Sequence, residues 1–204
     1  MTFYRLPPSK LYRYSEFRWL ERSLNFGEFR LRPASDYLSL EADTARQDDE
    51  LTRIRTSKRD SVRITLKSGQ EIRPISDLTY KSSIQIDYLT LCLSEDWHVD
   101  QFKAFSETDA CLIVNHPQTF RERFYVAMEK SFPDWGGMDG PITYGGRSPL
   151  GAMFSKPIEF LSQFEWRFCW VPPQRTAKLE PMIIRIGDLK DIAEIRLRSE
   201  AIYE

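Results

Sequence analysis

The segment best suited to chemistry is residues 163–170, QFEWRFCW, in which aromatic residues alternate with other residues. In a β-strand this alternation places four aromatic rings on one face and Gln163, Glu165 and Arg167 on the other. Four exposed rings in a row would form an apolar patch that soluble monomers rarely show, so the aromatic face is expected to be buried. The polar face then looks into solvent or into a cleft. In a dry cleft a fixed carboxylate stabilises developing positive charge, whereas on an open surface Glu165 and Arg167 would form an ion pair worth about 0–1 kcal/mol.

Two other short motifs place reactive or ligand-binding groups on predicted strands. Leu11-Tyr12-Arg13-Tyr14 lies on a strand predicted over residues 10–14, directly before a helix. Cys92-Leu93-Ser94-Glu95 ends the run of residues 84–94, whose alternation gives way to nearly continuous apolar residues, as in a central strand of a covered sheet. An arginine presents a planar fork of donors that suits phosphate. The simpler interpretation of the same residues is a surface arginine and core aromatics.

In their order along the chain, these three motifs resemble the arginine, serine and glutamate arrangement of ADP-ribosyltransferases, where a Gln or Glu stands two residues before the catalytic Glu. They also resemble, more closely and over about residues 10–170, an uncharacterised bacterial domain family. That family has an opening Leu-Tyr-Lys/Arg-Tyr, a central Cys-Phe/Leu-Ser-Glu and a late Glu-x-Glu-Trp/Tyr-Arg. The chain departs from the enzymes at the middle strand, where TLCLS (residues 90–94) replaces the usual Ser-Thr-Ser.

The resemblance implies an α+β fold of two small, mostly antiparallel sheets with flanking helices, and NAD as co-substrate. It implies that Glu165 carries the catalysis and that Gln163 orients the acceptor. Arg13 would bind the pyrophosphate of NAD, and Ser94 would hold Glu165 in position. The residues expected to stack on nicotinamide are Tyr12 and Tyr14.

The resemblance also implies a macromolecular acceptor, either protein, DNA or RNA, and a role as a bacterial toxin or phage-defence effector with a cognate inhibitor. In such enzymes the loop before the catalytic strand often recognises the target. Trp135, Tyr144 and Arg167 are therefore the expected acceptor contacts. The glycines between residues 136 and 151 predict an extended loop in this place.

The remaining periodicities predict the elements that must position these motifs. A helix is expected from a Ser15 cap to a Gly27 stop, and another is expected to open at Pro117. Short strands are expected over residues 29–31 and 111–114, a hairpin turns at Ser68-Gly69, and a last strand covers residues 182–186 before a short helix over 188–195. The charged stretch of residues 41–60 predicts a helical or mobile insertion in an otherwise single domain covering residues 1–204.

Composition limits the classes of protein that remain. The chain has 29 Lys and Arg residues against 30 Asp and Glu, so it has no global basic field for nonspecific nucleic-acid binding. Three widely spaced cysteines and the lack of an apolar leader or span favour a cytoplasmic protein without a membrane segment. His98 and His116 have no partners at zinc-site spacing, so no metal site is predicted.

Two other functional classes remain open. A nucleic-acid-binding module would use a cluster of basic residues, namely Arg53, Arg55, Lys58, Arg59 and Arg63. A non-catalytic interaction protein of the same fold would keep the architecture without the reaction. NAD binding separates the enzyme from both classes, and a steep salt dependence of RNA or DNA affinity would favour the nucleic-acid-binding module.

Overall fold

The computed structural model describes residues 6–39, 49–105, 107–174 and 178–200. These residues form an α+β domain around an eight-stranded antiparallel sheet. Six of its strands follow the order β13-β2-β7-β1-β8-β14, and β12 and β9 extend the sheet from β7. The bounds are β1 Leu11–Ser15, β2 Glu28–Pro33, β7 Leu89–Ser94, β8 Ala110–Val114, β9 Gly136–Pro141, β12 Glu165–Val171, β13 Met182–Arg185 and β14 Ala193–Leu197.

The main core lies on one face of this sheet. Leu89, Leu91 and Leu93 of β7 are buried there beside Trp166 and Phe168 of β12. The expected central strand is confirmed, although it begins at residue 89 and not at 84. The aromatic face of β12 is buried as expected, but it holds three rings: Phe164 has a left-handed backbone (φ 43°) before the strand begins, and its side chain is exposed.

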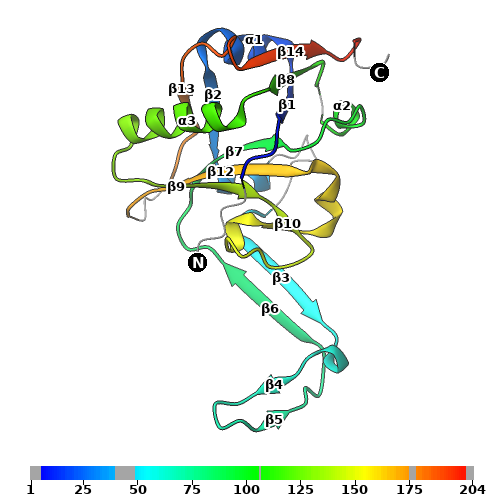
Figure 1. Cartoon of the computed structure of the whole chain (residues 1–204). Helices are drawn as coiled ribbons and strands as arrows, with labels where there is room; N and C mark the ends of the chain where they lie inside the picture. The colour runs from blue at the N-terminus through cyan, green and yellow to red at the C-terminus, as the bar shows by residue number, and fades with distance from the viewer. Residues whose placement is uncertain (1–5, 40–48, 106, 175–177, 201–204) are drawn as a thin grey trace.

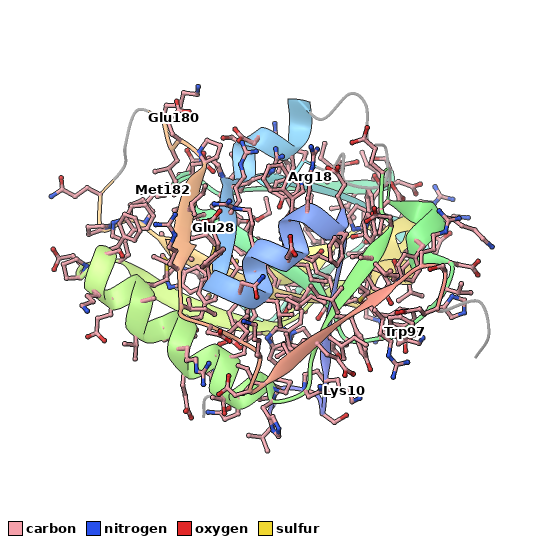
Figure 2. All side chains as sticks on the ribbon, turned by 90° about the horizontal axis from the view of Figure 1, so that it is seen from above. Lys10, Arg18, Glu28, Trp97, Glu180 and Met182 are labelled. Carbon is pink, nitrogen blue, oxygen red and sulfur yellow. The ribbon has the colours of Figure 1, made fainter. Side chains whose placement is uncertain are left out.

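Two longer helices cover the sheet. α1 (Phe17–Phe26) links β1 to β2 and crosses between β13 and β14, as Figure 2 shows. Gly27 ends it in the left-handed conformation (φ 60°) as expected, but Glu16 and not Ser15 is the N-cap residue. α3 (Pro117–Ser131) buries Phe120, Phe124 and Met128, which share one side of the helix. This side packs against β12, where Phe124 stacks on Trp170 with ring centroids 5.1 Å apart. A single-turn helix, α2, covers Gln101–Ala104.

Two local expectations were wrong, because pairing between strands distant in the sequence overrode the local pattern. The glycine-rich stretch is not a loop at its start but strand β9, where Gly137 makes room for the Trp170 ring: an added Cβ would lie 2.7 Å from Nε1. Residues 193–197 form β14 against β8 and not a helix. Within the charged stretch, residues 52–57 form strand β3, while residues 40–48 lie outside the described residues.

The two small sheets expected from the sequence are one large sheet, because β7 joins its halves. In the described part of the chain three two-stranded ladders accompany it, formed by β10 (Thr143–Tyr144) with β11 (Ser155–Lys156), β3 (Thr52–Ser57) with β6 (Leu78–Ser83), and β4 (Ile64–Thr65) with β5 (Glu71–Ile72). Short 3-10 helices are η1 (Ala34–Ser39), η2 (Arg59–Ser61), η3 (Ala152–Phe154) and η4 (Ile158–Gln163). Of the helices in the described residues, none is both long and apolar enough to cross a bilayer.

Residues 52–83, called the arm below, extend away from the main sheet (Figure 1). The arm consists of the β3–β6 ladder, η2, and the β4–β5 hairpin at its far end. The hairpin predicted around Ser68-Gly69 is confirmed: Ile64 pairs with Ile72, and the amide of Gly69, at φ 84°, donates to Leu66.

Candidate functional site

The main sheet splits beside β7, and the split forms the floor of a pocket. β12 pairs with β7 along all of Leu89–Ser94 and so occupies one edge of that strand. The other edge is shared: β2 pairs with it at Leu89 and Thr90, and β1 pairs with it at Ser94. Between these points Nη1 of Arg13 donates a hydrogen bond to the carbonyl of Cys92 at 3.2 Å. Arg13 therefore satisfies a backbone group that the diverging strands leave unpaired.

The pocket above this split has a volume of about 570 Å³. Its walls come from β1, the start of α1, β2, β7, Lys156 of β11 and the beginning of β12. Six of the residues singled out in the sequence line it: Tyr12, Arg13, Tyr14, Ser94, Gln163 and Glu165. Residues more than 150 positions apart along the chain therefore meet in one cavity.

Glu165 belongs to a buried group of four charged side chains and is not on an open strand surface. Its Oε1 accepts from Nε of Arg167 at 2.6 Å, and its Oε2 accepts from Nζ of Lys156 at 3.1 Å. Arg167 is fully buried and binds both carboxylate oxygens of Glu50, with Nη2 donating to Oε1 at 2.7 Å. Lys156 also approaches Glu50 at 3.6 Å. Two cations and two anions balance, as buried charges require.

The electrostatics of this group keep Glu165 ionised. Burial alone would raise the pKa of Glu165, but the charges of Arg167 and Lys156, together with hydrogen bonds from Arg167 and the Cys92 thiol, lower it well below its ordinary value. Burial and the nearby Glu165 charge raise the pKa of Cys92 to about 12. Cys92 is therefore a neutral thiol at physiological pH that donates to the carboxylate, not a nucleophile.

Gln163 and Ser94 lie at the pocket but differ in what they contact. Gln163 ends η4 and not the strand, and its Oε1 accepts from Nζ of Lys156 at 2.9 Å. It is thus coupled to Glu165 through the shared lysine. Ser94 is opposite Glu165 across the strand pair, but its hydroxyl donates to the carbonyl of Asp96 at 3.0 Å. Lys156 and Arg167 hold the carboxylate, in place of the serine expected from the resemblance.

Tyr12 and Tyr14 also line the pocket, but aromatic neighbours already contact their rings. Tyr12 lies 5.9 Å and Tyr14 6.0 Å from the Trp97 ring, and Phe102 meets Tyr14 edge-on. The hydroxyl of Tyr14 accepts from the amide of His98 at 3.0 Å. Burial and the nearby Cys111 raise the pKa of Tyr14, so it stays protonated. These contacts assign both rings to a second core cluster.

The three expected acceptor contacts are not among the residues that line the pocket. Trp135 packs against Phe132 just after α3, with ring centroids 5.0 Å apart. Tyr144 contacts the backbone of Glu165: its hydroxyl accepts a hydrogen bond from the amide N–H of Glu165 at 2.8 Å. Arg167 is fully buried by Glu50 and by the carbonyl of Met153. Burial therefore makes Arg167 inaccessible to an acceptor, whereas Trp135 and Tyr144 are half-buried and lie outside the pocket lining.

Sequence reasoning missed two cationic residues of the pocket wall, Arg30 and Arg32 on β2. Among the described residues, neither arginine makes an ion pair, in contrast to Arg22, which binds Glu28 at 2.8 and 2.9 Å. The signal was present as alternation in residues 28–32, EFRLR, since Phe29 and Leu31 are buried in the core.

Lys156 and Glu50 had no comparable signal in the sequence. Lys156 follows a short 3-10 turn, and Glu50 lies in a stretch expected to be solvated. Both are at most 5% exposed. Only the fold brings them to Glu165. Comparison of the chain with protein-family models, with curated proteins and with solved structures gave no match, so its function has to be argued from this geometry.

Proposed function

We propose that this protein binds NAD in the pocket at the sheet split and transfers ADP-ribose to a macromolecular acceptor. The observation that supports the proposal is the meeting of three motifs, distant in sequence, in one cavity: Tyr12, Arg13 and Tyr14, then Ser94, then Gln163 and Glu165. An ordinary solvated strand face would not require these motifs to converge. The cytoplasm, where NAD is available, is the proposed compartment.

The pocket has a size that suits a dinucleotide, and arginines on its wall suit the pyrophosphate. Its volume of about 570 Å³ falls within the roughly 300–1,000 Å³ of typical ligand sites. Arg30 and Arg32 bind the pyrophosphate together with Arg13, because guanidinium groups form charge-assisted hydrogen bonds to phosphate oxygens. Trp19 on α1 lines the pocket with half of its surface exposed and offers a ring for stacking.

Glu165 acts at the reacting ribose. As the bond between C1′ of the ribose and the nicotinamide nitrogen breaks, its electron pair leaves with nicotinamide and positive charge develops on the ribose. The ionised carboxylate of Glu165 stabilises that charge, and such preorganised groups contribute about 10²–10³ in rate. The acceptor's nucleophilic atom then bonds to C1′ and releases its proton to water. Gln163 orients the acceptor; it lies close to Glu165 because both side chains accept hydrogen bonds from Nζ of Lys156.

The test is nicotinamide release from NAD by purified protein, with cell lysate as the source of acceptors. Glu165→Gln is expected to lower release at least about 100-fold. Glu50→Gln is the matched control: it breaks the same buried ion group but changes a residue that does not line the pocket. Each rate is divided by the folded fraction, measured by thermal unfolding. Full activity in Glu165→Gln, or equal losses in the two variants, would contradict the catalytic role.

A second candidate is a non-catalytic NAD-binding protein that works through a partner. It is favoured by the fact that both oxygens of Glu165 already accept from Arg167 and Lys156, which offsets the negative charge that catalysis needs. In that case NAD raises the melting temperature without nicotinamide release.

Under either candidate Arg30→Ala/Arg32→Ala weakens NAD affinity at least about tenfold, while Lys130→Ala/Arg198→Ala outside the pocket does not. A wild-type protein that does not bind NAD refutes both candidates.

A further inference from the structure

The arm, residues 52–83, is built without a core of its own. None of its side chains that the structure describes is buried. Ile75 is 94% exposed and Ile54 67%, and Tyr80 is about half exposed. Isolated two-stranded ribbons are marginally stable in water and need a covering surface. The arm is therefore better suited to contact a binding partner than to stabilise the fold.

Positive charge is concentrated on this arm. Its 32 residues contain eight Lys and Arg residues against three acidic residues, a net charge of +5, although the whole chain has a net charge of −1. The remainder of the chain therefore has a net charge of −6. Within the described residues, five of the arm's cations make no ion pair: Lys58, Arg63, Lys67, Arg73 and Lys81. These charges extend from Lys81, near the base, to Lys67 at the hairpin turn.

We infer that the arm binds duplex DNA, with its ribbon in the major groove and its cations on the phosphates that flank the groove. A two-stranded ribbon fits the major groove of B-form DNA, whereas the major groove of A-form RNA is too narrow for it. Six paired residues of the β3–β6 ladder span roughly 20 Å at about 3.4 Å per residue, alongside about 12 phosphates. Cations distributed along a ribbon match such an evenly charged rod better than a compact acidic patch on a protein. This inference does not depend on NAD binding or on the proposed reaction.

The joint between the two ladders supports a defined shape. The amide of Arg59 in η2 donates to Oδ1 of Asp77 at 3.0 Å, which ties the two strands of the arm together at its bend. Across the β3–β6 ladder the hydroxyls of Thr56 and Thr79 lie 3.2 Å apart within hydrogen-bond distance. The exposed apolar side chains, Ile54 and Ile75 among them, suit contact with thymine methyl groups in the groove.

The test is fluorescence anisotropy of a labelled 20-base-pair DNA duplex with the full chain over a range of salt concentrations. The variant Arg63→Ala/Lys67→Ala/Arg73→Ala removes three cations from the arm and is expected to reduce the slope of log K against log salt by about 2–3. The control Lys10→Ala/Lys130→Ala/Arg198→Ala removes the same charge from the body and is expected to leave the slope unchanged. Circular dichroism checks that both variants are folded.

Four results would overturn the inference. Wild-type protein that fails to bind the duplex at low salt excludes a DNA-binding arm. Equal slopes for the arm variant and the body control place the binding surface elsewhere. If a poly-glutamate peptide competes as well as unlabelled DNA, the arm binds acidic proteins and not DNA in particular. If a duplex RNA competes as well as DNA, the arm does not recognise the major groove of B-form DNA. NAD is absent from this assay, so its outcome is separate from that of nicotinamide release.

Discussion

At the scale of single residues, one buried carboxylate links the fold to the proposed chemistry. Glu165 lines the pocket, yet Arg167 and Lys156 bind it from the protein side. Removing one member of a buried ion pair typically costs about 3–5 kcal/mol, because the partner charge is left unpaired. Stability and activity are therefore coupled at this position, and a loss of rate in a Glu165 variant has to be corrected for unfolding.

Because Glu165 is ionised in the folded protein, the free energy of unfolding is expected to depend on pH. Its pKa in the folded protein is below the ordinary value of 4.5, so the unfolded chain binds this proton more readily. The stabilisation is present above about pH 4.5 and is lost as the pH falls further toward the folded-state pKa. Between pH 7 and pH 3, the free energy of unfolding measured in urea is expected to drop at least about 1 kcal/mol more for wild type than for Glu165→Gln.

The control for this acid dependence is Glu129→Gln, which removes an exposed carboxylate on α3. It should follow the wild-type pH profile closely. If Glu165→Gln and wild type lose the same free energy on acidification, the carboxylate is not held ionised by its neighbours.

At the scale of elements, the turn after α1 fixes how the helix meets the sheet. Gly27 adopts φ 60°, and a Cβ placed there would run into the backbone of Gly187. The two segments also bond directly, since the amide of Ile186 donates to the carbonyl of Gly27 at 3.0 Å. This contact positions α1, and with it Trp19 and Arg22 on the pocket wall.

Two glycine substitutions are therefore expected to lower the free energy of unfolding by different amounts. Gly27→Ala combines an unfavourable backbone conformation with a backbone clash and is expected to destabilise by about 3 kcal/mol. Gly69→Ala in the arm has a comparable φ of 84° but open space around the new Cβ, so it should cost only about 1–2 kcal/mol. Denaturant unfolding measures both, and equal costs would show that the Gly187 contact yields easily.

At the scale of the whole molecule, the body and the arm differ in charge and in packing. β7 pairs with three strands and is buried along most of its length, whereas no described side chain of the arm is buried. Local opening costs least where few apolar contacts hold the backbone. Hydrogen exchange should therefore be faster by at least about 100-fold at the paired amides of β3 and β6 than at those of β7 and β12. Uniform protection across the chain would contradict this division.

The sequence by itself determined the parts of this protein that depend on local patterning. Continuous apolar residues identify β7 and β8, and helical spacing identifies the buried side of α3, because these patterns directly encode which face leaves water. The three motifs of the candidate site were recognisable for the same reason: each is a short run of neighbouring residues on a strand or directly beside its end. The alternation along β2 that marks Arg30 and Arg32 was equally local.

Only the tertiary structure decided which charged side chains are neutralised by buried ion pairs and which remain available to a ligand. Arg167 and its partner Glu50 are separated by 117 positions, and no periodicity links residues so far apart. Strand β9 depends likewise on pairing with β12, and the sheet split at β7 depends on where β1 and β2 part. Ion pairing and strand pairing are set by distance in space, so the buried ion group around Glu165 and the projection of the arm follow from the fold alone.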